Sequence, residues 1–356
     1  MRQMLVSANL EGRHIARPVY ARSGTVALQA GTRLTEAHVH TLRQQGYHSV
    51  YVEDPAVEDV QPTPLVGEPV LLEAARALEH LLGELRASHD PLQGYTALAA
   101  LQRAGVAMAR EVLSSPADAE LDTLLFLPAL PPEVGHPLRT ALLALALGRE
   151  ARLGVDDLQH LAHAALLADV GCALLPTGAA PHPGPLEPPD GHEHPDLSFH
   201  VVQRYGHLSA RVAAAVAAHH ENWDGSGYPG HLRGAAIFPL ARVLRISEAF
   251  DGALHPPSGQ GLPPHQAIEF IMGYAGEWFD PELVQPFARR ISIYPKGLTV
   301  QLNTGEVAVV TAPNVGHIGR PRVRVVAGPE RTRLDCPVDV GQAHHQSRLI
   351  AGPTSW

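Results

Sequence analysis

The chain is poor in cysteine. Its 356 residues include only Cys172 and Cys336, which lie far apart and are not spaced as a metal-binding pair. So few cysteines exclude a disulfide framework and fit a protein kept in a reducing compartment. The composition of 45% hydrophobic and 18% charged residues is ordinary for a globular protein, so we expect a sizeable buried core.

Long apolar runs and blocks of one charge are also missing. No stretch approaches the ~20 apolar residues that span a bilayer, and no cationic start followed by an apolar run marks a signal peptide. The formal net charge is -9, with acidic and basic residues interspersed. This pattern disfavours a long nucleic acid or a membrane surface as a partner. We therefore expect a cytoplasmic protein.

The secondary-structure signals change along the chain, from short strands to helices and back to strands. Helical periodicity covers most of the middle, so the predicted fold class is mainly α. Five segments are predicted: a small α+β module at 1–59, a linker and helical lead-in at 60–119, a helical domain at 120–295, a small β appendage at 296–335 and a tail at 336–356.

Histidine is the unusual residue type, with 22 copies, so the position of each matters more than the total. Residues 219–230 read His-His-Glu-Asn-Trp-Asp-Gly-Ser-Gly-Tyr-Pro-Gly and follow an apolar helix. Neighbouring residues on a helix point about 100° apart and rarely serve one ion. At a helix end, however, both rings can turn toward one cavity. His219 and His220 are therefore candidate metal ligands.

Single acidic residues interrupt two apolar helices. Asp169 ends the run that begins at Ala162, and Glu248 lies inside the run from Leu240 to Phe250. A buried carboxylate is costly unless it is paired or coordinated, which makes both residues candidate ligands. The alternative for Asp169 is an ordinary turn residue at a helix end. His194, at the start of another predicted helix, is a further candidate.

The region from about Gly135 to Tyr294 resembles the HD-GYP domains, a branch of the HD metal-dependent phosphohydrolases. The resemblance is carried by residues 219–230 and supported by His194-Pro195, Pro239–Arg242, Phe250-Asp251 and Phe279–Pro281. It implies an HD-type helical bundle and hydrolysis of cyclic di-GMP to pGpG or GMP in bacterial second-messenger signalling.

The resemblance also implies a centre of two or three divalent metal ions, iron or manganese. Asp169 and Glu248 would be catalytic. The implied ligands are Asp169, His194, His219, His220 and Glu248, with His136 as a further one.

The sequence departs from the family motif at four places. Ala168 replaces the histidine of the His-Asp pair, and Cys172 replaces the lysine near the substrate phosphate. Glu248 stands where the family has aspartate, and residues 253–257 lack the Arg-Pro-Tyr-Arg segment that helps hold the nucleotide. His163 is off the helical face of Ala168, so we do not expect it to compensate.

The loop after the paired histidines carries the remaining candidates. Tyr228 and Pro229 are expected to shape a rigid loop at the mouth of a cavity, and Gly227 allows turns that other residues would strain. The same loop could serve only to close the fold. In the family it is also a surface for partner domains, particularly GGDEF domains. Arg242 is expected as a salt-bridge partner or as a phosphate ligand.

Two functions remain open at this point. The first is a metal-dependent cyclic di-GMP phosphodiesterase, and the second is a degenerate domain that binds cyclic di-GMP or a partner protein without turnover. A purely structural role is disfavoured, because the buried carboxylates and imidazoles would then be costly. GGDEF-domain proteins and a second copy of the chain, forming a homodimer, are the expected protein partners.

Overall fold

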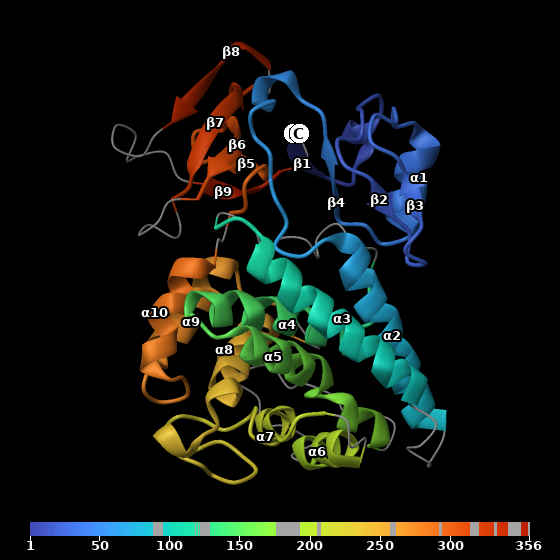
Figure 1. Ribbon diagram of the computed structural model, residues 1–356. Coiled ribbons are helices and arrows are strands. Elements are labelled where there is room, and N and C mark those ends of the chain that lie inside the picture. The colour runs from blue at the N-terminus through green and yellow to red at the C-terminus, as the bar shows by residue number, and fades with distance from the viewer. Residues whose placement is uncertain are drawn as a thin grey trace. The chain divides into compact units, whose positions relative to one another are not determined.

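The computed structural model describes residues 1–87, 95–117, 119, 121, 129–175, 193–204, 208–256, 261–291, 294–313, 320–330, 333–340 and 350–354. It divides into two compact units (Figure 1). The helical unit contains residues 70–115 and 130–290. The mixed unit contains residues 1–69, 116–129 and 291–356.

The helical unit is built from nine α-helices in its described residues, most of them amphipathic. Their bounds are α2 (Glu68–Ala87), α3 (Tyr95–Ser114), α4 (Pro132–Glu150), α5 (Val155–Leu167), α6 (His194–Arg204), α7 (Ala210–Ala217), α8 (Pro239–Leu254), α9 (Pro264–Gly273) and α10 (Pro281–Arg290). The first two residues of α2 belong to the mixed unit. A short 3-10 helix, η5 (Val170–Leu174), follows α5.

Helix α4 is central to the helical unit. It is buried on nearly every side from Val134 to Gly148, and it packs against α5, α8 and α10. A helix that is apolar all round needs neighbours on every face, which explains why the other helices gather around it. Gly148 permits the close approach of α5, because a Cβ there would lie 2.8 Å from a methyl of Leu158. This packing fixes the end of α5, where Asp169 follows.

The mixed unit begins with a small α+β arrangement. Strands β1 (Arg2–Leu5) and β4 (Ser49–Val52) pair antiparallel, as do β2 (Val19–Tyr20) and β3 (Val26–Leu28). Helix α1 (Glu36–Gln44) starts with a capping box in which Thr35 and His38 each accept a backbone N–H from the other. A core that includes Met4, Ile15 and Val52 lies between these elements.

The second part of the mixed unit is a five-stranded antiparallel sheet. It contains β5 (Thr299–Leu302), β6 (Val307–Ala312), β7 (Arg322–Ala327), β8 (Arg333–Val340) and β9 (Ile350–Pro353), in the order β8-β7-β6-β5-β9. Thr299 Oγ1 donates to the carbonyl of Gln3 at 2.6 Å. The N-terminal strand and this sheet are therefore joined within one unit.

The prediction of a mainly α fold is confirmed. None of the helices in the described part of the chain combines the length and hydropathy needed to cross a bilayer. The apolar stretch 121–130, whose sequence pattern predicts a helix, falls largely outside the described residues.

The predicted tail at 336–356 needs correction, because it contains the end of β8 and all of β9. Both are edge strands, and both contain proline, at Pro337 and Pro353. Proline weakens a strand signal but is tolerated at a sheet edge. The structure also differs from the predicted five segments by placing the N-terminal module and the β appendage in one unit, and α2 and α3 largely with the helical domain.

Candidate metal centre

Asp169 lies at the junction between α5 and the 3-10 helix η5. The α-helix ends at Leu167, and the side chain of Asp169 does not cap η5. Asp169 is 7% exposed, and its carboxylate points toward His194. Asp169, a single acidic residue after an apolar helix, is therefore buried, as the sequence pattern predicted.

Gly171 brings the first turn of α6 against this junction. A Cβ at position 171 would lie 2.5 Å from the carbonyl oxygen of His194 and 2.5 Å from the backbone nitrogen of Ser198. The Gly171 N–H donates to Ser198 Oγ at 2.9 Å. Only glycine fits at such a backbone contact, so the sequence itself places His194 beside Asp169.

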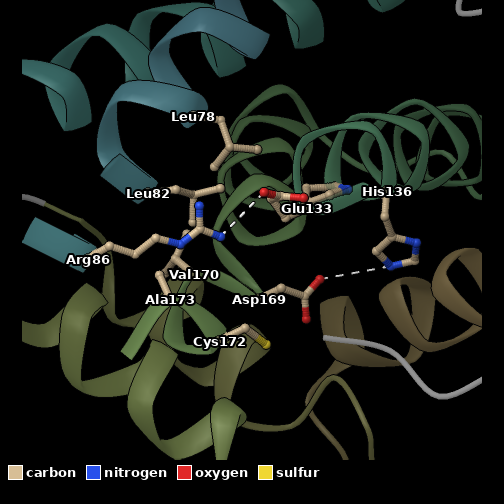
Figure 2. Close-up of a pocket in the computed structure, with 10 residues that line it drawn as sticks. Leu78, Leu82, Arg86, Glu133, His136, Asp169, Val170, Cys172 and Ala173 are labelled. Carbon is tan, nitrogen blue, oxygen red and sulfur yellow. Dashed lines mark hydrogen bonds and ion pairs between the residues drawn. The ribbon is translucent and has the colours of Figure 1, made fainter. Parts of the chain in front are cut away.

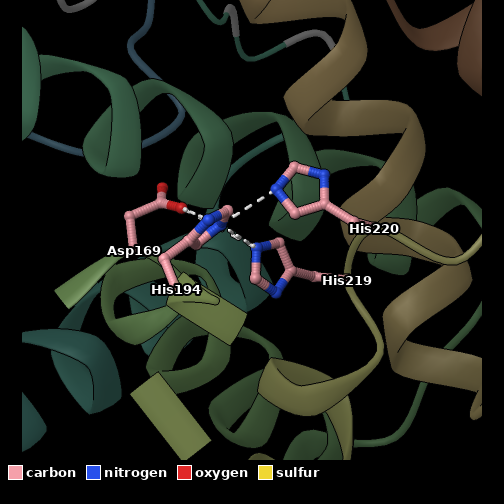
Figure 3. A group of neighbouring side chains, drawn as sticks. All are labelled: Asp169, His194, His219 and His220. Carbon is pink, nitrogen blue, oxygen red and sulfur yellow. Dashed lines mark hydrogen bonds and ion pairs between the residues drawn. The ribbon is translucent and has the colours of Figure 1, made fainter. Parts of the chain in front are cut away.

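Three imidazoles converge on Asp169 (Figure 3). His194 begins α6, whereas His219 and His220 occupy the turn after α7. His194 Nε2 lies 3.2 Å from His219 Nε2 and 3.0 Å from His220 Nε2. Asp169 Oδ1 lies 3.4 Å from His194 Nε2 and 3.7 Å from His219 Nε2. These four donor atoms all lie within 4.8 Å of one another.

The spacing of the four donors fits one divalent metal ion. With metal–nitrogen distances of about 2.1 Å, neighbouring ligand atoms lie roughly 3.0 to 3.4 Å apart in octahedral or tetrahedral geometry. The separations of 3.0, 3.2 and 3.4 Å fall in that range, and that of 3.7 Å between Asp169 Oδ1 and His219 Nε2 is slightly longer. Three imidazoles with one carboxylate are a donor set that suits iron, manganese or zinc. The residues present therefore fit a metal ion.

The tautomer of His219 agrees with that role. Its Nδ1 lies 2.5 Å from the carbonyl oxygen of Val216. A carbonyl can only accept, so Nδ1 carries the proton and Nε2 of the neutral ring has its lone pair directed at the other donors. Burial opposes protonation of His219, but Glu248 and Asp169 outweigh it and raise its pKa to about 9. Binding of an ion would therefore release a proton over most of the physiological pH range.

A second group of residues lies on the other side of Asp169. His136 Nε2 is 3.9 Å from Asp169 Oδ2, and His136 Nδ1 is 2.7 Å from Asp251 Oδ2. Asp251 also accepts from Arg139 Nε at 2.5 Å and lies 3.0 Å from His255 Nδ1. Burial alone would raise the pKa of Asp251, but Arg139, His136 and His255 hold it well below its usual range.

Glu248 lies near both groups, one turn of α8 before Asp251. Its carboxyl group is 4% exposed, and Oε1 is 3.9 Å from His219 Nε2. It is not one of the four residues whose donors converge. Among the predicted ligands, Asp169, His194, His219 and His220 thus form one cluster, with Glu248 and His136 at its edge.

Two of the four altered motif positions, Ala168 and Cys172, are close to Asp169 in the chain. Ala168 is fully buried and offers no donor atom. Burial, with Asp169 and Glu248 nearby, raises the pKa of the Cys172 thiol, so this residue is neutral where the family has a cation. His163 Nε2 is 2.9 Å from the carbonyl of Gln102 on α3. It therefore points to another helix and does not replace the missing histidine.

The loop after the paired histidines is tightly anchored. Glu221, which the sequence left without a role, accepts the backbone N–H groups of Gly230 at 2.6 Å and Leu232 at 2.9 Å. Gly227 has no room for a Cβ, which would collide with the backbone of His220 and Asn222. Tyr228 stacks on His220, with ring centroids 4.8 Å apart and planes at 16°. The loop therefore orients one of the candidate ligands.

The two remaining loop candidates have less direct contacts with the cluster. Pro229 follows Tyr228 through a cis peptide bond. Arg242 donates to the carbonyls of Ile237 and Ala235 and lies 3.3 Å from Asp280 Oδ2. Its guanidinium is therefore engaged in the salt bridge that was one of its two predicted roles.

Sequence reasoning named Asp251 only as part of a motif and missed Arg139 entirely. The available signal was their spacing, because Asp251 is three residues after Glu248 and so lies on the same face of α8. Arg139 is likewise three residues after His136 on α4. The meeting of α4 with α8 is a tertiary contact, which residue spacing alone does not reveal.

Comparison with known proteins places this geometry in a family. Residues 126–283 match the family model described as HD domain. A cyclic di-GMP phosphodiesterase of Pseudomonas aeruginosa is 29% identical over 60% of this chain and 53% of its own length. A 3'3'-cGAMP-specific phosphodiesterase of Vibrio cholerae is 31% identical over 42% of this chain and 30% of its own length. The chain thus spans about half or less of these relatives.

A solved structure supports the fold. The structure described as an HDG"Y"P protein from Bdellovibrio bacteriovorus superposes with a TM-score of 0.52 at 17% identity. The match covers 80% of this chain and 97% of the other. At such low identity the likeness concerns the fold.

Proposed function

Because this chain belongs to the HD-GYP family, we propose that it is a metal-dependent phosphodiesterase that hydrolyses cyclic di-GMP to pGpG or GMP. The observation that carries the proposal is the convergence of Asp169, His194, His219 and His220 within 4.8 Å. Several relatives named as cyclic di-GMP phosphodiesterases support the choice of substrate.

We propose that the four converging residues hold one divalent ion, iron or manganese. When bound, such an ion supplies Lewis-acid polarisation of the phosphoryl group and activation of water. Asp169 presents Oδ1 to the imidazole cluster and Oδ2 to His136, so it can serve both sides of the centre. Glu248, buried and close to His219, is the group available to hold a proton from the attacking water.

The loop residues have supporting roles in this proposal. Tyr228 orients His220 by stacking, and Gly227 with Pro229 shapes the turn that brings Tyr228 there. Arg242 holds the loop through its carbonyl contacts and does not touch substrate. GGDEF-domain partners, a homodimer and a cytoplasmic location stay predictions from the sequence.

A second function is favoured by one specific observation. Ala168 stands where the family motif has an imidazole, and Cys172 stands where it has a permanent cation. Neither replacement supplies the lost group. A centre that binds one ion but cannot complete hydrolysis would serve as a receptor for cyclic di-GMP in signalling. The two functions share the cluster and differ in turnover.

The test is hydrolysis by the purified full chain loaded with iron or manganese under reducing conditions. Products of cyclic di-GMP are separated by chromatography, and bound metal is measured by elemental analysis. We expect pGpG or GMP from the wild type and none from Asp169→Ala. The matched control is Asp196→Ala, because Asp196 is an exposed aspartate in the first turn of α6.

The outcomes separate the two functions. Products that persist in Asp169→Ala would overturn the proposed site. Tight binding of cyclic di-GMP without any product would replace the phosphodiesterase by the receptor. Absence of both metal and nucleotide binding would exclude both functions.

A further inference from the structure

A cavity opens beside the His136 side of Asp169 (Figure 2). The empty space within it, open solvent at its mouth included, is about 590 Å³. Helix α2 contributes Leu78, Leu82 and Arg86. These residues are spaced four apart, so they share one face of the helix. Helix α2 lies before the region that matches the HD domain, so that family model does not include this wall.

The opposite wall and floor belong to the candidate centre. They are formed by Glu133, His136 and Pro137 of α4, and by Asp169, Val170, Cys172 and Ala173 around η5. Asp169 therefore has one oxygen near the imidazole cluster and the other on the side of this cavity. A phosphate bound at the cluster would leave the rest of a nucleotide in or near the cavity.

Arg86 is the only arginine or lysine among the described residues that line the cavity. Figure 2 shows its guanidinium reaching from α2 toward Glu133, with Nη2 3.4 Å from Glu133 Oε1. The two side chains are 52% and 33% exposed. An ion pair this open to solvent is weak, so a stronger anion can take the arginine from its partner.

Arg139, another arginine on α4, is already committed. Arg139 Nε lies 2.5 Å from Asp251 Oδ1, and the Asp251 side chain is 1% exposed. Removing a partner from a buried carboxylate is strongly unfavourable, so Arg139 is held in place. A cyclic dinucleotide carries two phosphodiester groups, and the cluster can accept only one of them. The second needs a cation, and Cys172 does not supply it.

We propose that Arg86 is a substrate-binding residue that receives the second phosphodiester of a cyclic dinucleotide. Guanidinium groups bind phosphate through two parallel charge-assisted hydrogen bonds, and both oxygens of a phosphodiester can accept them. Glu133 is the counter-ion that Arg86 leaves when substrate enters. This inference rests on the proposed function, because it takes the first phosphodiester to lie at the metal centre.

The test compares two substrates on the manganese-loaded full chain. Cyclic di-GMP has two phosphodiesters, whereas bis(p-nitrophenyl) phosphate has one and needs no second cation. We expect Arg86→Gln to lower kcat/KM for cyclic di-GMP by about 10- to 100-fold, mainly through KM. It should leave hydrolysis of bis(p-nitrophenyl) phosphate and the metal content unchanged. Arg86→Lys should recover part of the loss.

Two further variants sharpen the result. Arg76→Gln removes the same charge from an exposed position on α2 that does not line the cavity, so it should behave as wild type. Glu133→Gln removes the competing carboxylate and should lower KM for cyclic di-GMP, by up to about fivefold. Equal losses for both substrates in Arg86→Gln, or no loss for cyclic di-GMP, would overturn the proposal.

Hydrolysis by the wild type distinguishes failure of the proposed function from failure of the proposed role of Arg86. If it hydrolyses neither substrate, the phosphodiesterase proposal fails, and binding of cyclic di-GMP is then measured by calorimetry. A Kd at least about tenfold weaker in Arg86→Gln than in wild type and Arg76→Gln supports the role of Arg86. Equal Kd values, or no binding by the wild type, contradict it.

Discussion

The two sides of Asp169 differ in the number of metal-binding side chains near them. Toward Oδ1, three imidazoles from two separate segments meet with donor separations that fit one metal ion. Toward Oδ2, His136 is present, but the neighbouring motif positions are Ala168 and Cys172. Donor atoms therefore gather on one side of the candidate centre and are fewer on the other. If the proposed function is right, substitutions on the two sides should separate metal binding from the rate of hydrolysis.

The supporting contacts differ in the same way. The intact side is held by backbone, through Gly171 against α6 and through the Val216 carbonyl on His219. The altered side depends on a buried charged network around Asp251. Separate substitutions can therefore disrupt the contacts on each side of Asp169.

The largest effect is expected from His219→Ala on the intact side. Loss of supporting residues around a metal typically costs 10- to 100-fold in affinity, and loss of a direct ligand costs more. We therefore expect a fall of more than about 100-fold in metal affinity, measured by competition with a chelator, and loss of hydrolysis. His265→Ala, at an exposed position of α9, is the control.

The matching change on the altered side is His136→Ala. We expect it to keep the ion held by the other four residues while lowering the rate of hydrolysis. If His136→Ala lost the metal as fully as His219→Ala, the two sides would not be separable and the comparison would be wrong.

Asp251→Asn should mainly reduce stability. Removing one charge from a buried pair typically costs about 3 to 5 kcal/mol, and Asp251 contacts Arg139, His136 and His255. The folded protein holds the pKa of Asp251 below its unfolded value of about 3.9. The stabilisation is therefore complete well above pH 4 and is lost as the pH falls through the lower, folded pKa.

Urea unfolding of the metal-free protein tests this sign. Wild type and Asp251→Asn should differ most near pH 7, and their free energies of unfolding should converge as the pH falls below about 4. A difference that grows on acidification would contradict the assigned direction.

Ala168→His tests whether restoring the histidine of the family motif allows a second metal ion to bind. The new imidazole would directly precede Asp169 in the chain, and we expect the metal content to rise from about one toward two ions per chain. Ala168 is fully buried, so a larger side chain can cost about 1 to 3 kcal/mol through overpacking. Ala168→Leu adds comparable bulk without a donor and is the matched control. Unchanged metal content in a folded Ala168→His would mean that the second position is closed.

The smallest effect concerns the thiol of Cys172. Its pKa is raised by burial, with Asp169 and Glu248 adding to the shift, and only the thiolate reacts with alkylating reagents. At pH 8 we expect iodoacetamide to react at least about tenfold more slowly than with a free thiol in solution. Peptide mapping by mass spectrometry separates Cys172 from Cys336, and Cys172→Ser identifies its signal. Rapid modification of Cys172 would contradict the raised pKa of its thiol.

Much of the helical unit was predictable from sequence. The 3.6-residue pattern indicates α2, α3, α5, α9 and α10 closely, because each has one apolar face against the same core. Strand β1 was missed, since Arg2–Leu5 contains no β-branched residue. Strands β8 and β9 were missed because they are edge strands with proline, and pairing rather than propensity forms them.

The site was predictable only in part. A chain pattern identifies residues with suitable chemistry, and all four members of the converging cluster were among the candidates. It does not show which donors meet, because Asp169, His194 and His219 come from three separate segments. Glu133 and Arg86 line one cavity although they are 47 residues apart, a meeting that no local spacing encodes.

The contact at Gly171 has one further consequence. Since the backbone of η5 touches the backbone of α6 there, the separation of Asp169 from His194 is fixed by the polypeptide and not by an ion. The two candidate ligands would therefore need little ordering on binding a metal ion, and the entropy lost should be small. A side chain at position 171 would move both at once. The proposed metal affinity would thus depend on a residue that has no donor atom.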